Sequence, residues 1–161
     1  MPRDGTKTRS AIAAGALALL REAGLAGFSV AGVAARAAVG KGLVLYHYGS
    51  RARLVELCGA RVEQERSGRL RAAAAGHQGV AAIDAVWAEL VRQQQDGTAR
   101  AWLSLAAAGA VTTPDDDDLV VQARRALLDG CAAALATGGS VAAAREAYEA
   151  LALALLRMEG D

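Results

Sequence analysis

Apolar residues recur three and four positions apart along most of this 161-residue chain, the period of a helix that buries one face. Residues 8–23 carry such a stripe, and residues 141–158 carry another. No segment alternates at period two for long, and the Ala-rich composition favours helix. We therefore expect an all-α protein. The pattern and its Gly and Pro breaks predict helices over residues 8–23, 30–37, 41–48, 51–71, 80–95, 98–111, 115–137 and 141–158.

Residues 29–48 contain two short helical patterns joined by a tight turn. Ser29 suits the N-cap of the first, and residues 38–40 form the turn, where we expect Gly40 to adopt a positive φ. In the second helix Val44 and Tyr48 lie four apart and should face inward. A short helix held at a fixed angle by another is the helix-turn-helix arrangement that reads the DNA major groove.

A longer sequence pattern, from Arg9 to Leu54, resembles the N-terminal domain of TetR-type (TetR/AcrR) transcriptional regulators. The resemblance implies an N-terminal three-helix helix-turn-helix DNA-binding domain over residues 6–66. A helical domain for dimerisation and effector binding would follow over residues 67–161. The residues that carry the resemblance are Ile12, Ala13, Ala14, Gly24, Ser29, Val33, Ala34, Val39, Lys41, Gly42, Tyr46, His47, Tyr48, Ser50, Arg51 and Leu54.

The second helix of the motif offers the residues that would read base edges. Lys41 can donate to a guanine edge or a phosphate, and Leu43 can contact a thymine methyl group. Gly42 lets the backbone approach the DNA closely. Tyr46 offers a hydroxyl and an apolar ring; burial inside the domain is the alternative for this residue, and the resemblance implies that it faces outward.

Three further residues are suited to phosphate contacts, which position a protein on DNA without reading its sequence. Ser29 and His47 lie near the two ends of the motif, and the resemblance implies the same role for Arg51.

Several positions depart from the family pattern, among them Ala31 and Ala35, which stand where polar residues often help. Gly40 stands where a Ser or Thr usually caps the second helix, and Leu45 stands where a phosphate-contacting Tyr is common.

Charge is unevenly distributed along the chain. Residues 1–71 hold 12 Lys and Arg against 5 Asp and Glu, a net charge of +7, and residues 72–161 hold 6 against 12, a net charge of −6. Such asymmetry indicates that the first half meets a polyanion. We expect residues 1–8 to form a basic arm ahead of the first helix.

The C-terminal half is expected to form a homodimer, because its last two helices are rich in Ala and Leu and the last carries a wide apolar stripe. Trp87 and Trp102 either line a pocket for a small hydrophobic effector or pack in a core, and core packing is slightly favoured. The Asp run at residues 115–118 is interpreted as helix caps and solvated surface, with metal binding a poor second.

The remaining chemistry is sparse. Cys58 and Cys131 lie in apolar helical surroundings and fit small buried side chains rather than a disulfide framework. Neither His47 nor His77 stands in a catalytic arrangement, so we expect no enzymatic activity, no metal and no cofactor.

No membrane segment is expected. The uncharged stretch over residues 101–114 is too short to span a bilayer, which needs about 20 apolar residues. Residues 3–20 have the outline of a secretory signal, but Arg21 and Glu22 follow at once and the helical pattern continues. A cytoplasmic protein is therefore predicted.

Two functions compete. The favoured one is a dimeric, sequence-specific transcriptional regulator that binds a palindromic operator in double-stranded DNA, most simply a repressor released by a small molecule. The alternative is a helical ligand-binding or protein-interaction module with impaired DNA reading, which Gly40 and Leu45 motivate.

Overall fold

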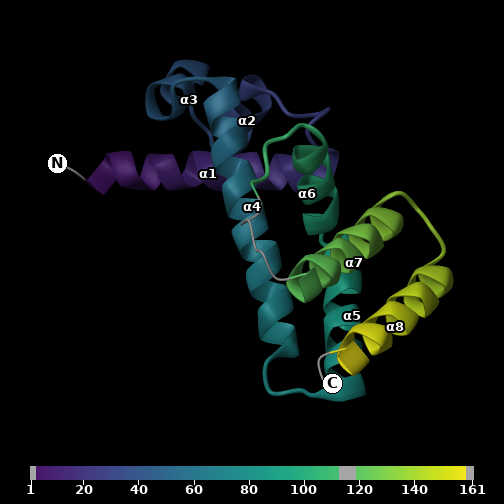
Figure 1. Ribbon diagram of the computed structural model, residues 1–161. Coiled ribbons are helices and arrows are strands. Elements are labelled where there is room, and N and C mark those ends of the chain that lie inside the picture. The colour runs from purple at the N-terminus through teal and green to yellow at the C-terminus, as the bar shows by residue number, and fades with distance from the viewer. Residues whose placement is uncertain (1–2, 113–118, 159–161) are drawn as a thin grey trace. The chain divides into compact units, whose positions relative to one another are not determined.

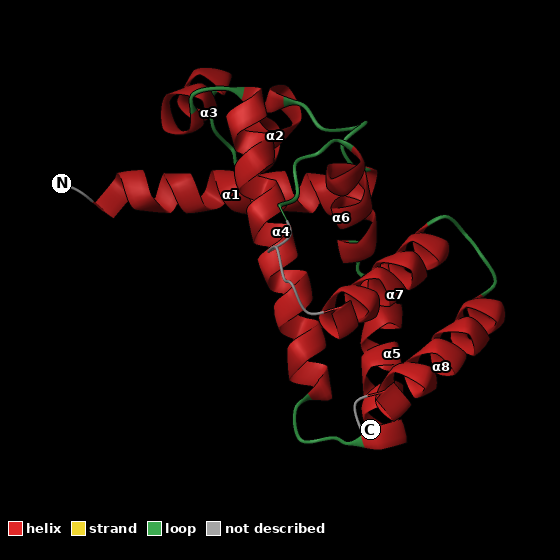
Figure 2. Ribbon diagram, viewed as in Figure 1, coloured by secondary structure: helices red, strands yellow, loops and turns green. Residues whose placement is uncertain are grey.

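The computed structural model describes residues 3–112 and 119–158, and every regular element within them is an α-helix (Figure 2). This confirms the all-α prediction. The helices are α1 (Arg3–Ala23), α2 (Val30–Arg36), α3 (Lys41–Tyr48), α4 (Arg51–Ala74), α5 (Gly79–Gln95), α6 (Thr98–Ala107), α7 (Leu119–Ala136) and α8 (Val141–Met158).

Two helix ends differ from the expectation. The helix α1 begins at Arg3, so most of the expected N-terminal arm is helical even though it contains Gly5, which disfavours helix. The helix α6 ends at Ala107 rather than near residue 111. Gly109 has a φ of 68°, and the amide of Ala110 donates to the carbonyl of Leu105, the left-handed ending that stops a helix. The Asp run at residues 115–118 lies outside the described residues.

The chain separates into two compact units. The first comprises residues 1–64 with 100–112, and the second comprises residues 65–99 with 113–161. Figure 1 follows the chain through both. Most of α6 therefore packs with the N-terminal helices, although it follows α5 in sequence. The domain boundary that we expected between residues 66 and 67 remains a prediction.

In the first unit, α1, α2 and α3 pack against one another around one apolar core. The residues at its centre are Ile12, Leu20, Val33, Val44, Leu54, Val62 and Leu105. The helix α6 closes this unit near the C-terminal end of α1. The amide of Leu25 donates to Ser104 Oγ at 3.1 Å, and Arg100 Nη1 donates to the carbonyl of Glu22 at 2.8 Å.

A second contact joins α4 to α6 inside the first unit. Trp102 is buried, and its indole Nε1 donates to Oε2 of Glu63 at 2.6 Å. Glu63 is buried although it is charged: only 9% of the residue is exposed. A buried carboxylate is tolerated here because it receives a hydrogen bond.

The second unit packs α5, α7 and α8 together, with Leu70, Ile83, Leu90, Cys131, Leu135 and Tyr148 in its core. Its polar contacts include charged residues of α4. Arg66 is 3% exposed and pairs with Asp129 at 2.7 Å. Arg69 contacts Glu89 at 2.6 Å and Asp96 at 2.7 Å.

Candidate nucleic-acid interface

The helix α2 begins as the sequence predicts. Ser29 is its N-cap, with an extended backbone, and its Oγ accepts a hydrogen bond from the amide of Gly32 at 3.0 Å. Phe28 and Val33, on either side of the cap, are both buried in the first core. They occupy the two positions of a hydrophobic staple, which fixes the angle at which the chain enters α2.

The turn between α2 and α3 corrects one prediction. The residue with positive φ is Ala38, at 53°, whereas Gly40 has a φ of −73°. The amide of Ala38 donates to the carbonyl of Ala35 and that of Val39 to the carbonyl of Ala34, which is the Schellman ending of a helix. The left-handed residue of this ending is Ala38, two residues before Gly40. Alanine has the smallest side chain that causes strain in the left-handed conformation.

Gly40 instead serves as the N-cap of α3 and provides no side-chain hydrogen bond. Its carbonyl accepts from the amides of Leu43 and Val44. Val39 packs partly buried against the core between the two helices. The weak cap expected from the sequence is therefore present, and α3 is held by packing rather than by capping.

The inner face of α3 fixes its orientation on the first unit. Val44 and Tyr48 are buried, as their four-residue spacing predicts. The Tyr48 hydroxyl donates to the carbonyl of Arg9 at 2.8 Å, and the Arg9 guanidinium lies 5.6 Å from the centre of the Tyr48 ring. These contacts tie α3 to α1, so the outer face of α3 is presented at a fixed angle.

That outer face carries the residues expected to read bases. Tyr46 is 81% exposed and Leu43 39% exposed, and Lys41 and Gly42 are exposed beside them. The rival interpretation, a buried Tyr46, does not hold. His47 is half-buried, with its ring edge-on to Tyr46 at 5.3 Å between ring centres.

Arg51 lies at the start of α4, beside the start of α2. Its Nη2 donates to the carbonyl of Phe28 at 3.4 Å, and its guanidinium lies 5.7 Å from the Phe28 ring centre. This contact orients the guanidinium close to the exposed Ser29, and the sequence showed no signal for it. Ser50 caps α4, its Oγ accepting from the amide of Arg53, whose side chain pairs with Glu56 at 3.0 Å.

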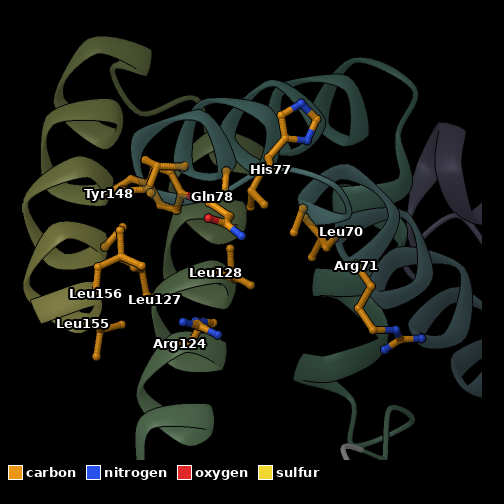
Figure 3. A pocket seen from close by; sticks show the side chains of 16 residues that line it. Leu70, Arg71, His77, Gln78, Arg124, Leu127, Leu128, Tyr148, Leu155 and Leu156 are labelled. Atoms are coloured by element: carbon orange, nitrogen blue, oxygen red, sulfur yellow. The ribbon is translucent and has the colours of Figure 1, made fainter. Parts of the chain in front are cut away.

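The second unit contains a cavity of about 540 Å³ between α4, α5, α7 and α8 (Figure 3). That volume lies in the range of small-molecule sites. Sequence periodicity did not reveal it, because four separate segments line it. The lining residues are Leu70, Arg71, Ala74, His77, Gln78, Gly79, Ala82, Ile83, Val86, Arg124, Leu127, Leu128, Tyr148, Ala152, Leu155 and Leu156.

The two tryptophans lie in different units and do not line this cavity. Trp102 belongs to the first core. Trp87 packs against Tyr148, with ring centres 5.5 Å apart, and the Arg145 guanidinium lies 5.5 Å from the Trp87 ring centre. Trp87 therefore contacts Tyr148, which lines the cavity, but does not line the cavity itself. A direct contact between either tryptophan and a ligand remains a prediction.

Other chemistry is limited within the described ranges. Those residues contain no cluster of three or more His, Cys, Asp or Glu placed to hold a metal ion. None of their helices combines the length and apolar character needed to cross a bilayer. Cys58 and Cys131 are buried free thiols, and burial raises the pKa of Cys58 to about 11 and also raises that of Cys131.

Comparison with solved structures shows that the fold is shared. The multidrug binding protein EbrR, solved with imidazole, is 23% identical, with a TM-score of 0.64 over 94% of this chain and 93% of that one. A TetR-family transcriptional regulator from Streptomyces coelicolor is 24% identical, with a TM-score of 0.61 over 92% and 99%. One from Rhodococcus sp., described as putative, is 20% identical, with a TM-score of 0.53 over 94% and 99%.

Among the curated proteins, none matches this sequence. A family model does match: residues 12–58 fit that of the bacterial regulatory proteins of the tetR family. The matched segment runs from the middle of α1 into α4 and so contains α2, the turn and the whole of α3. Together with the helix-turn-helix geometry, this match identifies residues 12–58 as a DNA-binding segment of the type found in the bacterial regulatory proteins of the tetR family.

Proposed function

We propose that this protein is a dimeric repressor that binds a palindromic operator and is released by a small hydrophobic effector. The observation that carries the proposal is the outer face of α3, where Lys41, Leu43 and Tyr46 are exposed. The inner face of the same helix is fixed by the burial of Val44 and Tyr48. Lys41 and Tyr46 would contact bases and Leu43 a thymine methyl group, with Gly42 allowing close approach. The proposed DNA-binding domain spans residues 6–66, and a cytoplasmic location follows from the function.

Phosphate contacts would come from Ser29, His47 and Arg51, which flank the base-reading face. Arg51 is held near the start of α2 by Phe28. Phosphate contacts set the register of a helix in the groove, whereas base contacts set its sequence preference. Exchanging Arg51 for Gln should therefore weaken binding to all sequences alike.

Dimerisation is proposed through α7 and α8, in the C-terminal domain over residues 67–161. These helices pack together, and α8 exposes Leu151 by 54% and Leu153 by 38%. Exposed leucines on an Ala-rich helix suit the interface of a four-helix bundle built from two copies. Sedimentation equilibrium tests this: a dimer is expected, and Leu151→Arg with Leu153→Arg should give a monomer that binds the operator weakly.

The effector is proposed to bind in the second-unit cavity. Its lining is mostly aliphatic, and its volume suits a small molecule. The similar EbrR protein is described as multidrug binding. By this mechanism the ligand favours an arrangement of the dimer in which the two recognition helices no longer match successive major grooves.

Selection of bound sequences from a random DNA pool, followed by gel-shift titration at several salt concentrations, tests the proposal. A palindromic consensus bound at moderate salt supports it. Binding that falls equally for all sequences as salt rises contradicts it. That outcome would favour the alternative, a helical ligand-binding or protein-interaction module that reads DNA poorly, which the exposed Leu45 motivates.

A further inference from the structure

The cavity of the second unit has an aliphatic interior, and the charged side chains of its described lining all have the same sign. Leu127, Leu128 and Leu156 line it from α7 and α8, and Ile83 lines it from α5. Figure 3 shows the labelled leucines around the open space. An interior of this kind favours a hydrocarbon body, because each buried CH₂ group contributes about 0.8 kcal/mol.

Every charged side chain among the described lining residues is basic. They are Arg71 from the end of α4 and Arg124 from α7, with His77, which can become cationic, in the loop between α4 and α5. All three are exposed, so they lie where the cavity meets solvent rather than in its interior. In Figure 3 the His77 and Arg71 side chains lie on one side of the labelled leucines of α7 and α8, with Arg71 pointing away from them, and Arg124 lies below Leu128.

The described lining contains no carboxylate. Asp84 and Glu149 both pair with Arg145, which lies against Trp87, and neither lines the cavity. The charged groups of the described lining are therefore basic, and guanidinium groups match carboxylate and phosphate groups in geometry and repel cations.

We infer that this cavity binds an anionic amphiphile, a hydrocarbon body with one carboxylate head group, and discriminates against cationic compounds of the same size. This rests on the proposed effector role of the cavity and assigns the chemical class of the effector. The hydrocarbon body lies among the leucines, and the head group lies at the opening between Arg71 and Arg124. A medium-chain fatty acid has these properties.

Three probes with the same ten-carbon chain test the inference: decanoate, decanol and decyltrimethylammonium, each titrated calorimetrically into the full-length protein below its micellar concentration. We expect decanoate to bind at least about tenfold more tightly than decanol, since charge-assisted contacts are the stronger ones. The cationic probe should bind more weakly than decanol. Decyl phosphate, as a fourth probe, separates carboxylate preference from a general preference for anions.

Variants locate the head group. Arg124→Gln and Arg71→Gln should each weaken decanoate binding about fivefold and leave decanol binding unchanged. Arg157→Gln, an exposed residue of α8 outside the lining, is the matched control and should change neither. Because Trp87 packs on the cavity residue Tyr148, decanoate should shift Trp fluorescence, and Trp87→Phe should abolish that shift.

The outcomes separate this inference from the proposed function. Equal affinity for decanoate and decanol, tighter binding of the cation, or an unchanged affinity in both arginine variants overturns the inference. Operator release by a neutral compound would still support the proposed effector role in those cases. Absence of binding by all the probes, together with failure of any apolar compound to release the operator, overturns both.

Discussion

Trp102 and Glu63 form a buried hydrogen bond, with 2.6 Å between the indole Nε1 of α6 and the carboxylate Oε2 of α4. The two residues are 39 positions apart in the chain and are 6% and 9% exposed. This contact anchors α6 to the first unit, whose other helices carry the proposed DNA-reading face.

Replacing Trp102 by Phe should destabilise the protein by at least about 2 kcal/mol, because the buried carboxylate loses its indole donor and the smaller ring leaves a void in the core. Urea unfolding followed by circular dichroism measures this. Adding Glu63→Gln to Trp102→Phe should recover part of the loss, since a neutral amide is less costly to bury than a carboxylate. Equal stability of Trp102→Phe and the wild type would rule out an energetic role for the contact.

Two glycines of α4 should respond oppositely to alanine. A Cβ at Gly59 would lie 1.8 Å from the carbonyl oxygen of Ala110, so Gly59→Ala must displace the segment after α6 and should cost about 1–3 kcal/mol. A Cβ at Gly68 meets nothing within 4 Å. Gly68→Ala should therefore stabilise the helix by up to about 1 kcal/mol. Thermal unfolding of both variants checks the difference in sign.

The turn before α3 can be improved at two positions. Gly40 is an N-cap without a side chain and has open space around its Cα, so Gly40→Ser should stabilise the protein by about 0.5 kcal/mol. Ala38→Gly removes strain at a φ of 53° and should be neutral or slightly stabilising. A marked loss of stability in Gly40→Ser would contradict the capping geometry.

Lys41→Ala and Tyr46→Ala should abolish sequence preference while changing the free energy of unfolding by less than about 0.5 kcal/mol, because both side chains are exposed. Gel shifts with the selected operator and a scrambled duplex measure preference. Tyr46→Phe separates the ring from the hydroxyl, and Lys41→Arg keeps the charge. Wild-type discrimination in both alanine variants would remove α3 from the proposed interface.

Cys58 should be almost inert towards alkylation in the folded protein. Its pKa is raised from 9.0 to about 11 by burial, so at pH 8 the thiolate fraction falls about 100-fold, and access is restricted as well. The raised pKa also links stability to pH: the contribution is complete below pH 9 and is lost as pH rises towards 11. Iodoacetamide labelling with and without urea, read by mass spectrometry, tests the first effect.

Equilibrium unfolding in urea between pH 8 and pH 11 tests the second effect, and Cys58→Ala is the control for it. The variant is expected to show less loss of stability over this range, because the titrating thiol is gone. A loss as large as in the wild type would assign the alkaline effect to other groups, such as Tyr148, whose pKa burial raises to about 12.

The sequence by itself determined the helices, the cap at Ser29, and the inward pair Val44 and Tyr48. These features depend on residues within about one helical turn of each other, and backbone geometry repeats with a fixed period. The family pattern over α1 to α4 was readable for the same reason, since its residues keep a constant register.

Only the tertiary structure decided which charged residues are buried and where a ligand could enter. The burial of Glu63 and Arg66 depends on Trp102 and Asp129, which come from helices far along the chain. The cavity likewise needs side chains from α4, α5, α7 and α8 together. The positive φ belongs to Ala38 rather than to Gly40, because the hydrogen bonds that end α2 determine which residue is left-handed. A glycine lowers the strain of that conformation but does not determine where it occurs.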